Sequence, residues 1–179
     1  MNPDTILAFW FDELEPKQHF VKDAKLDATI RERFGHMHAA AAHGELFAWR
    51  EDARGRLAEI IVLDQFSRNL HRDDPRAFAC DPMALVLAQE LVARRDDDAL
   101  PVAWRAFAYM PYMHSESPRI HELAMQLFSQ PGLEYNLKFE QAHKTIIDRF
   151  GRYPHRNAVL GRTSSKEEIA FLKEPGSSF

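Results

Sequence analysis

One stretch of the sequence, residues 57–71, combines a strongly apolar pattern with side chains that can bind or transfer charge. On a helix at about 100° per residue, Asp64 and Arg68 share one face, and Gln65 and Asn69 share another. Both pairs have the i,i+4 spacing that brings side chains into contact. A buried charge is costly unless it is paired, so these residues either lock a core together or line a pocket. In a pocket, Arg68 would bind a carboxylate or phosphate, and Asp64 would hold Arg68 or act as a base.

A second polar group, His114, Ser115 and Glu116, lies between Pro111 and an expected helix start at residues 117–118. His114 is a candidate general acid or base, with Glu116 adjusting its pKa. Adjacent side chains diverge along the backbone, so these three residues do not by themselves indicate a catalytic triad. In the alternative interpretation, Ser115 and Glu116 only cap the following helix, because carboxylates are stabilising near a helix N-terminus.

A third group is rich in arginine and lies at the end of the helix expected over residues 134–150. One interpretation is an anion site, helped by the backbone of a loop that contains Gly and Pro. The other interpretation is a solvated basic surface. The candidate residues of this group are Arg149, Arg152, His155, Arg156 and Asn157.

The sequence predicts neither a metal centre nor a cofactor. The histidines and glutamates of residues 114–122 lack the His-Glu-x-x-His spacing of a helical zinc site. The single cysteine, Cys80, excludes an intrachain disulfide, and we expect it to be a small core residue. We expect the three histidines of residues 36–43 to lie at the surface.

The composition is typical of one globular domain. The chain has 179 residues, of which 45% are hydrophobic, and a net charge of -4. This charge argues against a nucleic-acid partner, which usually needs a basic excess. No apolar run reaches the roughly 18 residues of a membrane span, and no signal peptide is recognisable. We therefore expect a soluble, cytoplasmic protein that does not enter a membrane.

The elements that position the three polar groups are expected to be helices, because alternating strand patterns are absent. Asn2, Asp81 and Ser117 each precede a proline, as an N-cap precedes a proline at the first helical position. Short connections favour antiparallel hairpins of about eight helices, without a sheet. Residues 1–174 are expected to form one domain and residues 175–179 a frayed tail. The expected helices span about 3–14, 23–43, 52–68, 81–95, 101–110, 117–130, 134–150 and 165–173.

Several motifs, in order along nearly the whole chain, resemble the bacterial family called Domain of Unknown Function 924. They are Phe9–Phe11, Ile61–Asn69, Ala77–Asp81, Tyr109–Glu116, Arg149–Asn157 and Glu167–Phe171. The family pattern usually has proline where Ser67 stands here. The resemblance implies an all-helical, tetratricopeptide-like superhelix and no established activity. Fold analogy suggests a peptide-binding scaffold, although the repeat expected of a tetratricopeptide groove is absent from the sequence.

Two hypotheses follow. In the first, the three groups converge on a pocket that binds a small anionic molecule, and acid–base hydrolysis is the reaction class. Its catalytic residues are His114, Glu116 and Asp64, and its ligand-binding residues are Gln65, Arg68, Asn69, Ser115, Arg149, Arg152, His155, Arg156 and Asn157. In the second, the protein is a scaffold that binds proteins or peptides, and the polar groups are structural. A dimer is compatible with both. Convergence of the three groups in space distinguishes the hypotheses.

Overall fold

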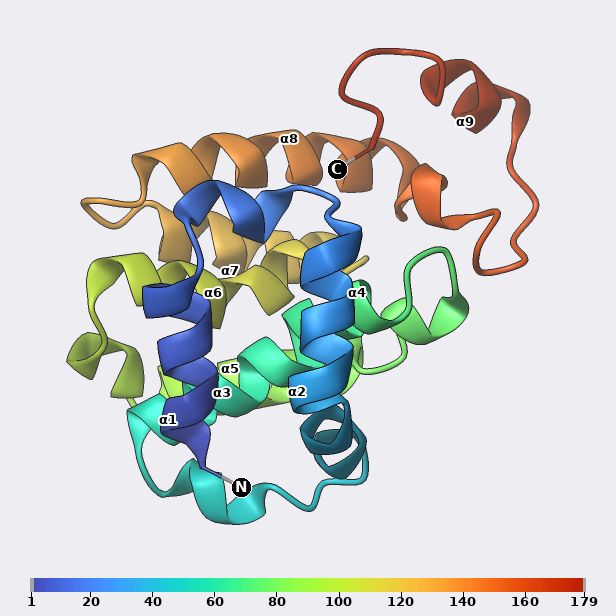
Figure 1. Ribbon diagram of the computed structural model, residues 1–179. Helices are drawn as coiled ribbons and strands as arrows, with labels where there is room; N and C mark the ends of the chain where they lie inside the picture. The colour runs from blue at the N-terminus through green and yellow to red at the C-terminus, as the bar shows by residue number, and fades with distance from the viewer. Residues whose placement is uncertain (1, 179) are drawn as a thin grey trace.

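The computed structural model describes residues 2–178, and within this range the regular elements are all helical, without a strand (Figure 1). The predicted all-α class is therefore confirmed. The α-helices are α1 (Pro3–Ala8), α2 (Ala24–Ala42), α3 (Ala53–Ile61), α4 (Ser67–Leu70), α5 (Asp81–Ala93), α6 (Val102–Met113), α7 (Pro118–Phe128), α8 (Glu134–Phe150) and α9 (Lys166–Phe171). Short 3-10 turns and two π-helical turns, Phe9–Glu13 (η1) and Val62–Phe66 (η4), connect or extend them.

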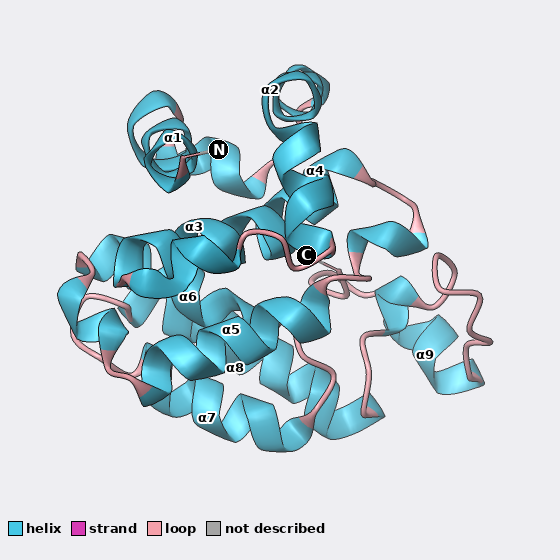
Figure 2. Cartoon of the chain, turned by 90° about the horizontal axis from the view of Figure 1, so that it is seen from below, coloured by secondary structure: helices cyan, strands magenta, loops and turns pink. Residues whose placement is uncertain are grey.

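The helices pack as a stack in which most successive long helices touch. Contacts run from α1 to α3, then to α5, α6, α7 and α8, while α2 packs on α4 and on η4. Figure 2 shows α1 and α2 on one side of this stack and α7 and α8 on the other. The core lies between them and is built on α3 and α6, whose side chains are buried almost all round. The tetratricopeptide-like superhelix stays a prediction.

A smaller apolar cluster lies at the carboxyl end of the chain, where Ile146, Ile147, Tyr153 and Phe171 are buried together. It attaches α9 and the segment after α8 to the end of the stack (Figure 1). Beyond α9, the hydroxyl of Ser177 donates to a backbone carbonyl, and this serine is buried. The domain boundary at residue 174 stays a prediction.

The capping signals place several helix starts correctly. Asn2 accepts a hydrogen bond from the Asp4 backbone N–H, and Ser165 and Glu168 form a capping box at the start of α9. The expectation for Asp81 was wrong, because Cys80 occupies the N-cap position and Asp81 already lies inside α5. Its carboxylate is therefore free of capping and bonds to an arginine side chain instead.

Two further expectations need correction. We expected Pro111 to end a helix at Met110, but α6 continues to Met113, with Pro111 in its last turn. Proline removes one backbone hydrogen bond, but the burial of Tyr112 and Met113 and the bond from His114 N to Met110 O sustain the turn. The surface position expected for the three histidines of residues 36–43 is confirmed for His36 and His43 and was wrong for the third.

The histidine concerned is His38, which is buried and forms a hydrogen bond of 2.8 Å with the Ser67 hydroxyl. Its hydrogen-bond partner comes from α4, which covers that face of α2. Burial and the neighbouring His71 lower the pKa of His38 to about 4. His38 therefore joins helices as a neutral side chain rather than meeting solvent.

Candidate active site

A pocket of about 350 Å³ opens between the start of α5, the end of α6 and the segment that follows α8. This volume is at the lower end of the range for small-molecule sites, which is about 300–1,000 Å³. Residues from two of the three polar groups line it. The lining residues are Pro75, Phe78, Ala79, Asp81, Pro82, Leu85, Pro111, His114, Ser115, Glu116, Arg156 and Leu160.

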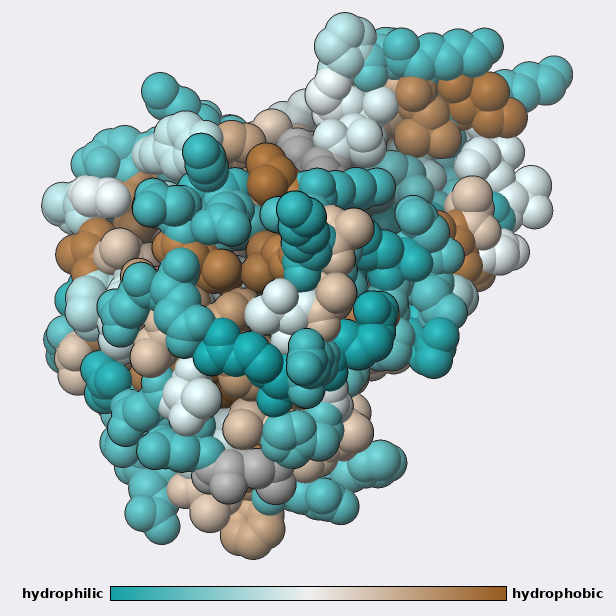
Figure 3. All heavy atoms as spheres, viewed as in Figure 1, coloured by the Kyte–Doolittle hydropathy of each residue, from teal (hydrophilic) through white to brown (hydrophobic). Residues whose placement is uncertain are grey.

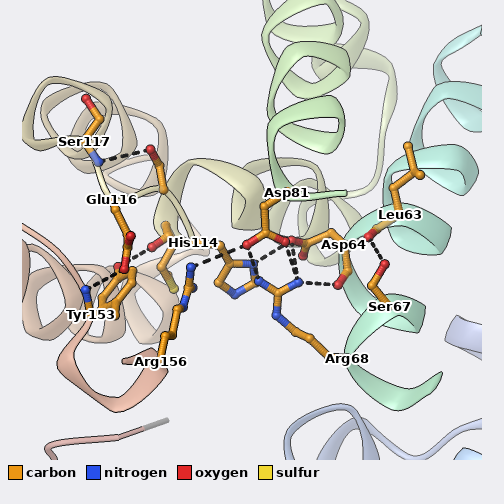
Figure 4. Close-up of polar contacts among 12 residues, drawn as sticks. Leu63, Asp64, Ser67, Arg68, Asp81, His114, Glu116, Ser117, Tyr153 and Arg156 are labelled. Atoms are coloured by element: carbon orange, nitrogen blue, oxygen red, sulfur yellow. Dashed lines mark hydrogen bonds and ion pairs between the residues drawn. The ribbon is translucent and has the colours of Figure 1, made fainter. Parts of the chain in front are cut away.

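Asp64 and His114 form a hydrogen-bonded pair beside this pocket (Figure 4). Asp64 Oδ1 lies 2.7 Å from His114 Nδ1, and the Asp64 side chain is 1% exposed. A carboxylate at Nδ1 makes this nitrogen the protonated one in the neutral ring. Nε2 has no hydrogen-bond partner in the described part of the chain, and His114 lines the pocket. Nε2 is thus the atom that can exchange a proton with a ligand.

The backbone of Asp64 lies in the π-helical turn η4, which interrupts the regular course of α3 and α4. A π turn bonds residue i to residue i+5, so side-chain directions depart from those of a regular helix. Gln65 consequently bonds to the Asp64 carboxylate at 2.5 Å rather than to Asn69. Asn69 instead donates to Asp27 of α2. The predicted pair between Gln65 and Asn69 does not form.

Arg68 links two carboxylates. Its Nη1 lies 3.3 Å from Asp64 Oδ1, which confirms the predicted i,i+4 contact. It also binds both oxygens of Asp81 at 3.0 Å, in the bidentate geometry typical of arginine and carboxylate. Burial alone would lower the pKa of Arg68, but the attraction of Asp64 and Asp81 raises it. The guanidinium group of Arg68 is therefore bound by protein carboxylates, and only part of it is available to a ligand.

Arg156 reaches the same carboxylate from the other side, as Figure 4 shows. Its Nη1 is 3.5 Å from Asp81 Oδ2, a long contact, and its buried Nε has no partner among the described residues. The rings of Phe78 and Tyr153 lie 4.6 and 4.5 Å from its guanidinium carbon. Burial and the nearby Arg68 lower the pKa of Arg156. Arg156 is 7% exposed, so it is a buried cation with unused N–H donors at the pocket wall.

Glu116 connects the loop after α6 to the segment after α8. Both of its oxygens bind Arg162, at 2.6 and 2.9 Å, and one accepts a hydrogen bond from the Tyr153 backbone N–H at 2.8 Å. Burial raises the pKa of Glu116, but the bonds to Arg162 and Tyr153 outweigh burial and lower it. Glu116 lines the pocket as a bound carboxylate and does not touch the His114 ring through any hydrogen bond.

A second buried network lies behind the pocket. His121 Nδ1 is 2.6 Å from Glu140 Oε1, and both side chains are fully buried. His121 Nε2 lies 2.8 Å from the Ser115 carbonyl oxygen, and the Tyr153 hydroxyl donates to Met113 O at 2.5 Å. These bonds fix the backbone on which His114 stands.

The other candidate residues lie away from the pocket wall, except for Ser115. Arg149 and Arg152 bind Glu167 and Glu168 of α9, and both pairs are outside the pocket lining. Asn157 is buried and bonds to the side chains of Ser164 and Arg162. His155 packs beside Tyr153, and burial together with the charge of Arg156 lowers its pKa to about 4. The structure thus brings Asp64, Arg68, His114, Ser115, Glu116 and Arg156 together.

Sequence reasoning missed four residues of the site, which are Phe78, Asp81, Tyr153 and Arg162. Asp81 was interpreted as a cap, although its place in one of the motifs of the family resemblance was a usable signal. Phe78 and Tyr153 also lie in such motifs, but their roles depend on contact with Arg156, which the sequence does not display. In residues 2–178, no group of three or more His, Cys, Asp or Glu side chains is placed to hold a metal ion.

Comparison with known proteins identifies relatives without an assigned activity. The model of the family described as bacterial protein of unknown function (DUF924) matches residues 6–176. The solved structure of a protein of unknown function, ATU0120 from Agrobacterium tumefaciens, superposes with a TM-score of 0.91 at 37% identity, covering 96% of each chain. No curated protein matches the chain. Across residues 2–178, each helix is too short or too polar to cross a membrane.

Proposed function

The chain belongs to the DUF924 family of bacterial proteins of unknown function, and from its pocket we propose that it binds a small anionic molecule and acts on it by acid–base hydrolysis. One observation carries this proposal. A buried arginine with unused donors, Arg156, and a histidine oriented by a buried aspartate, His114, line the same pocket. A cytoplasmic location is part of the proposal, because a single cysteine is compatible with a reducing compartment.

The chemistry assigns a separate task to each side chain. Arg156 holds the anionic group of the ligand through charge-assisted hydrogen bonds. Asp64 holds His114 in one tautomer, and Nε2 exchanges a proton with the reacting group. In hydrolysis, a water oxygen bonds to the electrophilic atom while the bond to the leaving group breaks. Nε2 takes the proton of the water and supplies one to the leaving group.

The second candidate function is a scaffold that binds proteins or peptides. The observation that favours it is that several predicted ligand-binding residues already form hydrogen bonds with other side chains of the protein. Gln65, Arg68, Asn69 and Asn157 all bond to side chains of the protein itself. On the face seen in Figure 3, however, hydrophilic side chains predominate and apolar atoms lie in separate groups. That face offers no broad apolar surface for a partner.

A thermal-shift screen tests the first candidate. The ligands are inorganic phosphate, phosphate monoesters, monocarboxylates and dicarboxylates, with divalent metal ions in separate wells. A ligand at 100 times its Kd stabilises the folded protein by about 2.7 kcal/mol. For a chain of this size this corresponds to a rise in Tm of about 5–10 °C. We expect one anionic class to produce such a rise.

Variants show whether the response arises in the pocket. Arg156→Gln should fold and lose the response, because it removes the cation that holds the anion, whereas His114→Gln should fold and keep a weaker response. Arg149→Gln is the matched control, since Arg149 pairs with Glu167 outside the pocket and its side chain is 44% exposed. If Arg156→Gln responds like the wild type, or if no anion raises Tm, the pocket proposal fails and the scaffold becomes the better hypothesis.

A further inference from the structure

We infer that the pocket takes a monocarboxylate with a short apolar or aromatic body, and that His114 binds one proton together with this ligand. This inference rests on the proposed function, because it names the ligand class of the same pocket. It follows from the charges that surround His114, from the donors left open on Arg156 and from the apolar walls.

The charged groups around His114 cancel one another when its ring is neutral. Two carboxylates and two guanidinium groups face the site. A third carboxylate beside them, that of Glu116, is neutralised by Arg162. Burial lowers the pKa of His143 to about 3 and raises that of Tyr153, so both are uncharged near neutral pH. By element, the facing groups are Asp64 and Arg68 of η4 and α4, Asp81 of α5, His143 of α8, and Tyr153 and Arg156 of the segment after α8.

A bound anion disturbs this balance. Burial lowers the pKa of His114 and Arg68 lowers it further, while Asp64 opposes both effects. The free ring is therefore neutral at neutral pH, with its open nitrogen toward the pocket. A carboxylate on Arg156 adds one negative charge that the protein does not match. A nearby opposite charge favours the protonated imidazole, and Nε2 is then a donor to the ligand.

A monocarboxylate fits this balance better than a phosphate. One proton on His114 neutralises a single negative charge, whereas a phosphate monoester carries close to two at neutral pH. The 3.5 Å contact of Nη1 with Asp81 is the one hydrogen bond that Arg156 makes within residues 2–178, so the N–H groups of Nη2 are left for a ligand, and a carboxylate matches the planar fork of a guanidinium. Asp81 shares Arg156 only through the contact of 3.5 Å, so a ligand can take up the remaining donors.

The remaining walls of the pocket favour an apolar body on this carboxylate. Apolar side chains make up more than half of the lining, and a volume of about 350 Å³ suits a small molecule rather than a nucleotide. The apolar lining residues that would meet the body of the ligand are Pro75, Phe78, Ala79, Pro82, Leu85, Pro111 and Leu160.

NMR titration with phenylacetate, 3-phenylpropionate and hexanoate tests the inference. The ring nitrogens of His114 are observed in the ¹⁵N-labelled protein and assigned by their absence in His114→Gln. We expect saturable binding, with Nε2 changing from an unprotonated to a protonated nitrogen. Because a proton binds with the ligand, Kd should rise about tenfold per pH unit above neutral pH. The neutral analogue phenylacetamide should bind at least tenfold more weakly.

Two variants make the result specific. His114→Gln should still bind phenylacetate, with a Kd that no longer changes with pH. Arg149→Gln should titrate like the wild type, because its guanidinium lies outside the pocket lining.

Three results would overturn the inference. Carboxylate binding without protonation of His114 and without pH dependence would refute proton uptake. Binding of inorganic phosphate but of none of the carboxylates would refute the ligand class. Both results would leave the proposed function standing. If neither phosphate nor any carboxylate binds, the proposed function fails together with the inference.

Discussion

Replacing Asp64 by asparagine removes one charge from the buried network without changing its size. The carboxylate accepts hydrogen bonds from His114 and Gln65 and lies 3.3 Å from Arg68. Burial by itself raises the pKa of Asp64, but attraction to protonated His114 and to Arg68, with the two hydrogen bonds, lowers it from 3.8 to about 2. At about 1.4 kcal/mol per pKa unit, this difference stabilises the folded state by up to about 2 kcal/mol, and the part that comes from protonated His114 is absent at neutral pH, where the ring is neutral.

The sign of the pH dependence follows from the lowered pKa. A carboxyl with a lower pKa in the folded state contributes its full stability above the unfolded value of about 4, and loses it as the pH falls toward the folded value of about 2. Asp64→Asn should therefore cost up to about 2 kcal/mol, or up to about 8 °C in Tm, and this cost should fall as the pH drops below about 4.

Urea unfolding at several pH values from about 7 to about 3 measures this difference. Asp148→Asn is the matched control, because the Asp148 side chain is 50% exposed and pairs with Lys144 at the surface. Exposed pairs contribute about 0–1 kcal/mol. If the cost of Asp64→Asn stays constant from neutral to acidic pH, the ionised form of Asp64 is not what the network stabilises, and the electrostatic account is refuted.

Two further pairs of substitutions have clear expectations. Glu116→Gln should destabilise the protein by about 1–3 kcal/mol in urea unfolding, because it weakens a half-buried, bidentate arginine pair, whereas Glu167→Gln removes an exposed pair and should cost less than about 1 kcal/mol. An equal loss of stability in Glu116→Gln and Glu167→Gln would contradict this expectation. Gly55→Ala should lower Tm strongly, since a Cβ there would lie 1.9 Å from the backbone oxygen of Trp49. An unchanged Tm in Gly55→Ala would refute this clash. Gly35→Ala is the control, because a Cβ at residue 35 meets open space, and it should stabilise α2 by up to about 1 kcal/mol.

The helical framework was predictable because its signals are local. The sequence signals around residues 134–150 and 23–43 reproduce α8 and α2 to within a residue, and the capping box marks the start of α9. The contact between Asp64 and Arg68 was also predictable, since four residues separate them on one helix. Each of these features depends on neighbours in the chain, which the sequence displays directly.

The assembly of the site was not predictable in the same way. Asp64 and His114 are 50 residues apart, and Arg156 and Asp81 are 75 apart, so only the packing of the stack brings them together. The π-helical turn η4 is a local feature, but it has no recognisable sequence signal and it redirects Gln65. The sequence therefore indicated candidate residues in three groups, and the fold brings six of these residues together.

The pattern of pairing within the site separates architecture from function. Asp64 and Arg68 each have several close partners, as a buried ionic network needs in order to offset the cost of desolvation. Arg156 is more buried than Arg68, but its contact with Asp81 is 3.5 Å long and its Nε has no partner in the described chain. An apolar side chain beside Phe78 and Tyr153 would fill this place at a lower electrostatic cost. A structural role accounts for Arg68, whereas the weak pairing of Arg156 is the observation on which the proposed ligand site rests.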